Sequence, residues 1–194
     1  GKGFILDILC GKTYALSPRS FYQINHDQTE VLYGLAVDAA HLTGNEVVLD
    51  AYCGIGTIGL TASGRAGQLI GVELNRDAVR DAIGNAKHNG VKNARFYAAD
   101  ATRWITEAAA AGQKADVIFM DPPREGSTPA FLDSVARMAP HRVVYVSCNP
   151  ETLARDLAHL TRKGYRVEQS TPVDLFPQTA HCEVVCSLIR CDFT

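Results

Sequence analysis

The 194-residue sequence lacks an apolar run of the roughly 18 residues that a membrane-spanning helix needs. It also lacks a recognisable signal peptide and any Cys-x-x-Cys pair, which argues against an oxidised secreted domain or a zinc ribbon. Charge is balanced, with 19 Lys+Arg against 21 Asp+Glu, and the net charge of −2 excludes a strongly basic arm that clamps nucleic acid by charge alone. These absences predict one cytoplasmic, monomeric domain with no membrane segment.

Six cysteines are present, and three of them, Cys182, Cys186 and Cys191, lie near one another in sequence. Their spacing invites comparison with a set of metal ligands, but usable thiolate pairs and nearby ligand histidines are missing. Within an apolar strand, cysteine behaves as a small hydrophobic residue. The sequence therefore predicts no metal site.

From about residue 45 onward, apolar strand-like runs alternate with segments of helical period. The runs are 47–49, 69–72, 94–99, 117–120 and 143–146, and the helical segments are 57–66, 77–89, 101–112, 129–138 and 151–163. Continuous apolar strands separated by helices are typical of a parallel sheet covered on both faces.

The two ends of the chain depart from this alternation. Residues 165–170 and 182–190 are two strands with no helix between them, so they should pair antiparallel. Residues 4–16, with Gly11-Lys12 at their centre, read as a β-hairpin, and 28–42 read as a helix. The sequence predicts an α/β fold: an N-terminal hairpin and helix (1–43), then a Rossmann-like core (44–194) with a mostly parallel seven-stranded sheet and an antiparallel C-terminal strand.

A G-x-G-x-x-G motif, residues 54–59, follows the first strand of the core and precedes a helix. Gly54 and Gly56 permit a tight turn and a close approach of the backbone to a ligand. Glu73, at the end of the next strand, is placed to accept hydrogen bonds from a ribose diol. The motif by itself fits either a dinucleotide or another adenosine-carrying cofactor.

Acidic residues end four consecutive strands of the predicted sheet. They are Asp50, Glu73, Asp100 and Asp121, and open α/β sheets bind ligands at those carboxyl ends. A carboxylate beside the glycine loop repels a pyrophosphate but attracts the ammonium and sulfonium of S-adenosylmethionine. This favours adenosylmethionine over NAD, and a class I methyltransferase fold, although Asp50 and Asp100 also fit the role of helix N-caps.

A nucleophile and a base are predicted on the same rim of the sheet. Cys148 ends the fifth strand just before a helix, where N–H dipoles should lower the pKa of its thiol. Glu183 begins the apolar antiparallel strand, so it should lie close to Cys148, with a raised pKa suited to a general base. The alternatives are a buried structural thiol and a solvated acid at a strand end.

These residues lie in motifs that resemble the catalytic domain of the RNA 5-methyluridine methyltransferases, the group of the tRNA uracil-54 and 23S rRNA uracil enzymes. The matching stretches are S-P-R-S-F-Y-Q-I-N (17–25), D-A-Y-C-G-I-G-T-I-G-L (50–60), G-V-E-L (71–74), D-P-P-R-E-G (121–126), V-Y-V-S-C-N-P-E-T-L-A-R-D-L (144–157) and D-L-F-P-Q-T-A-H-C-E-V-V (174–185). Gln178 and Cys182 stand where many members have His and Val.

The resemblance implies a role for each matching position. Cys148 would be the nucleophile that attacks uracil C6, and Glu183 the base that removes the C5 proton. The resemblance places Gln23, Tyr52, Thr57, Glu73, Asp100 and Asp121 around the cofactor and the target base, with Asp121 or Arg124 holding the pyrimidine edge. The substrate would be a uridine of rRNA or tRNA, in a loop or flipped out.

Family members carry an additional RNA-contacting region before the catalytic domain, and this chain shows no counterpart, so we expect it to be the catalytic domain alone. Three other interpretations remain at this stage: an N-methyltransferase that uses Asp121-Pro122-Pro123, an NAD-dependent oxidoreductase, and a non-catalytic RNA-binding module.

Overall fold

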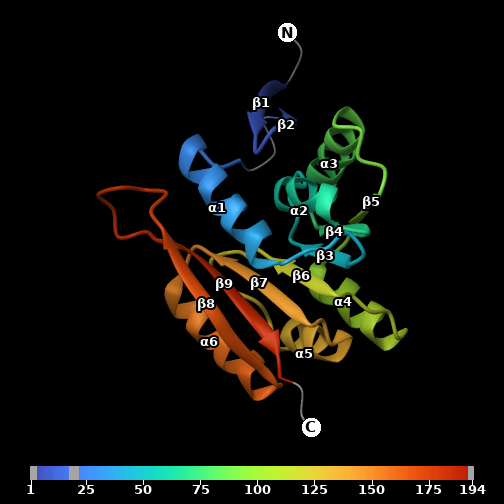
Figure 1. Cartoon of the computed structure of the whole chain (residues 1–194), viewed down its shortest axis with the longest axis vertical. Helices are drawn as coiled ribbons and strands as arrows, with labels where there is room; N and C mark the ends of the chain where they lie inside the picture. Colours follow the sequence, from blue (N-terminus) through green and yellow to red (C-terminus); the bar gives the residue numbers. More distant parts are fainter. Residues whose placement is uncertain (1–3, 18–21, 192–194) are drawn as a thin grey trace.

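The computed structural model describes residues 4–17 and 22–191, so part of the first motif, residues 18–21, lies outside the described residues. A seven-stranded sheet runs in the order β5-β4-β3-β6-β7-β9-β8 (Figure 1). Its strands are β3 Val47–Ala51, β4 Gln68–Glu73, β5 Ala94–Ala98, β6 Val117–Met120, β7 Arg142–Ser147, β8 Tyr165–Val173 and β9 Glu183–Arg190. Only β9 runs against its neighbours, as predicted.

Helices cover both faces of this sheet. They are α1 His26–Ala39, α2 Thr57–Ala62, α3 Arg76–His88, α4 Ala101–Ala110, α5 Pro129–Met138 and α6 Pro150–Arg162. The buried side chains of α1, α2 and α3 share one apolar cluster and those of α4, α5 and α6 another. Strand β6 shows why the predicted strands are continuously apolar. Phe119 packs in the first cluster and Ile118 in the second, so both faces of the strand are covered and all four of its residues are buried.

The N-terminal hairpin consists of β1 Ile5–Leu9 and β2 Lys12–Leu16. Its turn is Cys10-Gly11, one residue earlier than predicted, because these two residues adopt the positive φ values of 51° and 72° that a two-residue hairpin turn requires. Tyr14 anchors the hairpin to the core, since it is fully buried and its hydroxyl donates to the carbonyl oxygen of Thr57 at 3.2 Å.

Other element boundaries also differ from the sequence prediction, three of them for a visible reason. Helix α1 begins at His26 rather than residue 28, because the side chain of Asn25 accepts a hydrogen bond from the backbone N–H of Gln28 and caps the helix. Helix α2 ends at Ala62 and continues as a short 3₁₀ turn, Ser63–Arg65. Strand β8 extends to Val173, where it pairs with Glu183. No helix within 4–17 and 22–191 is long and apolar enough to span a membrane.

The register of β9 fixes the position of its first residue. Ser147, the last residue of β7, pairs with Val184. Glu183 precedes Val184 and Cys148 follows Ser147, so the antiparallel direction places these two residues at the same level of the sheet. The fold thereby brings the predicted nucleophile and base to the carboxyl ends of the parallel strands.

Candidate active site

A cavity of about 910 Å³ lies at the carboxyl ends of the parallel strands. The predicted site residues that line it are Gln23, Tyr52, Gly54, Thr57, Glu73, Asp100, Asp121, Arg124, Cys148 and Glu183. The fold thus gathers side chains from segments far apart in sequence into one site. The described lining also includes residues that the sequence analysis did not name, among them Tyr33 from α1 and Phe176 and His181 from the loop between β8 and β9.

Two predicted cofactor residues, Asp50 and Gly56, are not among the described residues that line the cavity. Asp50 lies beneath the glycine loop with 1% exposure, and its Oδ2 accepts the backbone N–H of Gly59 at 2.8 Å. Its Oδ1 has no hydrogen-bond partner in the described part of the chain. Desolvation raises the pKa of this carboxyl to about 7, with a further contribution from Glu73. Asp50 therefore lies below the cavity wall instead of on it.

The glycine loop turns sharply between β3 and α2. Tyr52, Gly54 and Gly56 have φ values of 63°, 54° and 84°, and Gly56 is the left-handed residue that precedes α2. Such values are open to glycine at little cost but strain tyrosine. The Tyr52 ring packs against Phe131, with ring centroids 5.2 Å apart, and its hydroxyl lies 3.4 Å from that of Ser127. These contacts hold the aromatic ring in the cavity wall.

Gly59, the third glycine of the motif, serves helix–strand packing. A Cβ atom there would lie 2.7 Å from Oδ2 of Asp50 and 2.9 Å from Cδ1 of Leu69. We expect Gly59→Ala to lower the free energy of unfolding by about 1–3 kcal/mol, because a crowded core cannot absorb an added methyl group. Denaturant unfolding measures this. Gly84→Ala in α3 is the matched control, since nothing lies within 4 Å of its added Cβ. Equal stability of the two variants would contradict the packing argument.

Glu73 and Asp100 each have a structural contact and also face the cavity. Glu73 accepts the backbone N–H of Gly54 at 3.1 Å and that of Asn75 at 2.8 Å, so it ties the end of β4 to the glycine loop. Asp100 caps α4 by accepting the N–H of Arg103 at 2.8 Å. The cap interpretation is thus confirmed for Asp100. The cap leaves Asp100 able to contact a ligand as well, because the residue also lines the cavity.

Asp121, Glu183 and Cys148 form an electrostatically coupled group. Burial, followed by the charges of Glu183 and Asp50, raises the pKa of Asp121 to about 8. Desolvation also raises the pKa of Glu183, which is only 5% exposed, as the sequence analysis predicted. Three ionisable groups that share a water-poor region resist carrying negative charge together. Asp121 therefore keeps its proton at neutral pH, and the pKa values of Glu183 and Cys148 are also raised.

The prediction of a lowered pKa for Cys148 is wrong for the free protein. Desolvation is the largest effect and raises the pKa of the thiol, and the charges of Glu183 and Asp121 raise it further. A backbone hydrogen bond and the positive charge of Arg124 oppose the shift but do not outweigh it. The two carboxyl groups lie at the ends of β6 and β9, the strands on either side of β7, so they act on the thiol from both neighbours.

Arg124 lines the cavity and contacts the loop between β8 and β9. One of its guanidinium nitrogens lies 3.1 Å from Nδ1 of His181. Because a guanidinium has only donors, Nδ1 accepts and the imidazole carries its proton on Nε2. His181 also packs edge-on against Phe176, with ring centroids 6.3 Å apart. The loop between β8 and β9 is thereby connected to the loop that follows β6.

Comparison with known proteins decides the family. A sequence profile of the tRNA (uracil-5-)-methyltransferase family matches residues 10–191, nearly the whole chain. The chain belongs to this family. A curated RNA methyltransferase from Lactiplantibacillus plantarum, itself uncharacterized, is 50% identical over 191 residues, which is 98% of this chain and 42% of that protein. A relative from Halalkalibacterium halodurans is 48% identical over 188 residues, 97% of this chain and 41% of that protein. The chain spans less than half the length of these curated relatives.

Solved structures agree with the family membership. The Pyrococcus abyssi tRNA (uracil-54, C5)-methyltransferase, solved with S-adenosyl-L-homocysteine, superimposes with a TM-score of 0.82 and 34% identity over 97% of this chain and 45% of that one. An S-adenosylmethionine-dependent methyltransferase from Agrobacterium tumefaciens has a TM-score of 0.76 at 16% identity, over 97% of this chain and 71% of that one, which shows the fold alone. The class I methyltransferase fold predicted from the sequence is confirmed.

Proposed function

We propose that this chain is the catalytic domain of an enzyme that uses S-adenosylmethionine to methylate C5 of uracil in RNA. The observation that carries the proposal is the juxtaposition of Cys148 and Glu183 at one cavity, produced by the register of β9 against β7. A nucleophile and a carboxyl group beside the same pocket are what C5 methylation of a pyrimidine needs. Membership in the uracil-5 methyltransferase family supports the same chemistry.

The cavity fits adenosylmethionine in its donor set and charge. Glu73 and Asp100 offer carboxylate oxygens for a ribose and an adenine, and Gly54 allows the backbone to approach closely. Gln23, Tyr52 and Thr57 add polar and aromatic surface. Asp121, with the buried Asp50 behind the loop, favours a ligand that carries positive charge. A pyrophosphate would oppose deprotonation of Asp50 and Asp121, whose pKa values are raised to about 7 and about 8, whereas a sulfonium would favour it. This difference disfavours a dinucleotide.

The affinity for adenosylmethionine should rise with pH between about 6 and 8. Because the pKa of Asp121 is raised to about 8, higher pH adds negative charge to the cavity, which costs stability in the free protein but attracts the sulfonium. We expect the dissociation constant to fall about threefold to tenfold over this range. Calorimetry at several pH values measures it. Adenosylhomocysteine, which lacks the sulfonium charge, should show a much flatter profile, and equal profiles for the two ligands would contradict the electrostatic assignment.

Bound adenosylmethionine supplies an electrophilic methyl group, and residues of this chain activate C5 of the target uracil to accept it. The thiol of Cys148, whose pKa is raised in the free protein, first gives up its proton to water. The resulting thiolate attacks C6 of uracil, which forms an S–C6 bond and leaves C5 electron-rich as part of an enolate. C5 takes the methyl group as the bond between methyl and sulfonium breaks, and Glu183 then removes the proton from C5. The electron pair of the C–H bond restores the C5–C6 double bond, and the Cys148 thiolate leaves.

Asp121 or Arg124 would hold the edge of the target base, since both line the cavity beside Cys148. Uracil C5 and C6 are shielded in a stacked helix, so the target uridine must lie in a loop or flip out. The balanced charge of the chain predicts weak, salt-sensitive RNA binding by this domain alone. We infer that most RNA affinity comes from a region outside these 194 residues, as the greater length of the relatives allows.

The proposal is tested by incubating the full-length protein with unmodified RNA and labelled adenosylmethionine, followed by digestion to nucleosides. Label should appear in 5-methyluridine. Label in an N-methylated nucleoside would favour an N-methyltransferase instead, and no transfer to rRNA or tRNA would contradict the proposal. Mapping the labelled nucleotide then separates an rRNA target from a tRNA target.

A further inference from the structure

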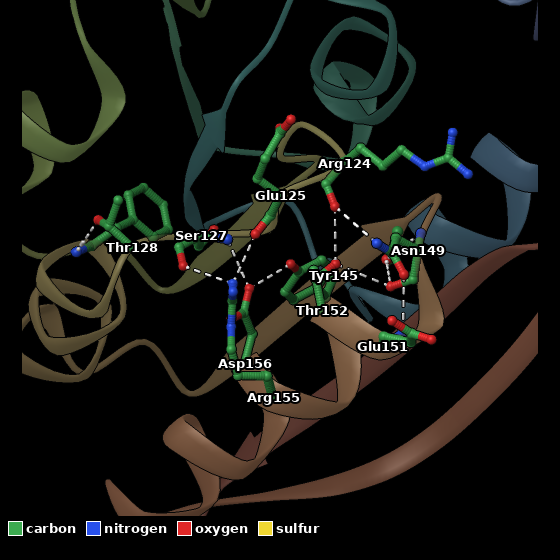
Figure 2. Close-up of polar contacts among 12 residues, drawn as sticks. Arg124, Glu125, Ser127, Thr128, Tyr145, Asn149, Glu151, Thr152, Arg155 and Asp156 are labelled. Carbon is green, nitrogen blue, oxygen red and sulfur yellow. Dashed lines mark hydrogen bonds and ion pairs between the residues drawn. The ribbon is translucent and has the colours of Figure 1, made fainter.

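The loop after β6, residues 121–128, is fastened to the first two turns of α6 by a set of polar contacts (Figure 2). The carbonyl oxygen of Arg124 accepts from Nδ2 of Asn149 at 3.1 Å and from the hydroxyl of Thr152 at 3.2 Å. Helix α6 begins at Pro150, two residues after Cys148. The loop that presents Asp121 and Arg124 is therefore tied to the same helix that follows the nucleophile.

Arg155 and Asp156 hold the next part of this loop. The carboxylate of Asp156 accepts the backbone N–H of Ser127 at 2.7 Å, and Arg155 pairs with the other carboxylate oxygen at 2.8 Å. The guanidinium of Arg155 also donates to the carbonyl oxygens of Glu125 at 2.9 Å and Ser127 at 3.2 Å. Backbone atoms of Glu125 and Ser127, on either side of Gly126, thus bind to one ion pair.

The same ion pair reaches the strand that ends at the nucleophile. The hydroxyl of Tyr145, on β7, donates to Oδ2 of Asp156 at 2.8 Å. Asp156 is fully buried, whereas the side chain of Arg155 is 56% exposed. Gly126 allows the loop to come this close, since its φ is +75° and an added Cβ would lie 2.7 Å from Oδ2 of Asp156. A buried carboxylate with this many partners fixes the positions of all of them.

We propose that Arg155 and Asp156 are positioning residues for methyl transfer: they hold the loop that carries Asp121 and Arg124 at a fixed place relative to Cys148. This inference rests on the proposed function. Neither residue is among the described residues that line the cavity, so their effect is exerted through the loop backbone and β7. Attack on C6 requires the target uracil and the thiol of Cys148 to be held close to a reactive geometry. Displacement of either group by about 1 Å can lower the rate about a hundredfold.

Arg155→Ala is the informative variant, because Arg155 lies partly in solvent and its loss leaves Asp156 with the Ser127 and Tyr145 donors. We expect kcat for RNA methylation to fall about tenfold to a hundredfold. The affinity for adenosylhomocysteine, which lacks the sulfonium charge that Asp121 attracts, should stay within about twofold, because the glycine loop and Glu73 are untouched. Amide hydrogen exchange at residues 124–127 should become faster, while exchange in the sheet stays unchanged.

Arg155→Lys should recover part of the rate, since an ammonium can pair with Asp156 but cannot span both loop carbonyl groups. Arg162→Ala, at the far end of α6, is the matched control and should behave like wild type. If wild type makes no 5-methyluridine, the proposed function fails. If wild type is active and Arg155→Ala is as fast as Arg162→Ala, the positioning role is wrong. A loss of rate that comes with equal losses of melting temperature and adenosylhomocysteine affinity would show a merely structural role and would also overturn it.

Discussion

Replacing Cys148 with alanine is expected to abolish methylation of RNA, with a rate loss of more than about a thousandfold, while the affinity for adenosylhomocysteine stays within about twofold. The reason is that C5 of uracil is a poor nucleophile until a thiolate adds at C6. The thiol is partly exposed at the cavity and is flanked by Asp121 and Glu183, whereas Tyr52, Glu73 and Asp100, which are proposed to hold the cofactor, lie at the carboxyl ends of β3, β4 and β5. Steady-state assays with labelled adenosylmethionine and calorimetry with adenosylhomocysteine measure the two quantities.

Cys191→Ala is the matched control for this experiment. Cys191 also keeps a partly exposed free thiol, and it lies beyond the far end of β9. It should retain wild-type activity. Turnover by Cys148→Ala at more than a few per cent of wild type would remove the covalent step from the mechanism and would return an N-methyltransferase to consideration. Loss of adenosylhomocysteine binding would instead point to a structural role of the thiol.

Replacing Glu183 with glutamine is expected to stop the reaction after methyl transfer. The amide cannot accept the C5 proton, so elimination of Cys148 is blocked and the protein remains joined to methylated RNA. The adduct should survive denaturing gel electrophoresis as a slowly migrating band whose formation requires adenosylmethionine. Glutamine has nearly the same shape, and it removes an acid whose pKa is raised by desolvation, so the fold should lose no stability at neutral pH.

Glu107→Gln is the matched control, because its side chain is 74% exposed on α4, away from the lined cavity. It should turn over like wild type and accumulate no adduct. If Glu183→Gln turns over at nearly the wild-type rate and no adduct appears, the base lies elsewhere. Asp121, whose pKa is raised to about 8, would then be the next residue to replace.

The sequence predicted the sheet well because parallel strands buried on both faces leave a strong signal. Strand β6 is a four-residue apolar run in the sequence and is buried throughout its length in the structure. The same logic located the site: residues that end such strands, including Asp121 and Cys148, meet at one edge. The position of Glu183 beside Cys148 could be predicted from the direction of β9, which is set by the short, helix-free connection from β8.

Other parts of the site depend on packing that sequence spacing does not reveal. Asp50 ends a strand like its neighbours, but its side chain turns beneath the loop to Gly59, away from the cavity. The pKa of Cys148 was misjudged because the helix start was visible in the sequence, whereas the desolvation and the combined charges of Glu183 and Asp121 were not. Tyr33 enters the cavity wall from α1, with no motif to mark it.

The contacts of Arg155 and Asp156 show the same limit. Both residues lie in a motif that the sequence analysis quoted, yet helical period alone does not tell which side of α6 faces the loop after β6. The buried carboxylate becomes interpretable only when its partners, Ser127 and Tyr145, are seen together (Figure 2).

The central claim is that Cys148 bonds covalently to the uracil that becomes methylated. It is tested most directly by digesting the Glu183→Gln adduct with protease and ribonuclease and sequencing the modified peptide by tandem mass spectrometry. We expect the peptide that contains Cys148 to carry the mass of one uridine nucleotide plus one methyl group, on the cysteine itself. A modified peptide bearing another residue, or a trapped nucleotide without the methyl group, would contradict it.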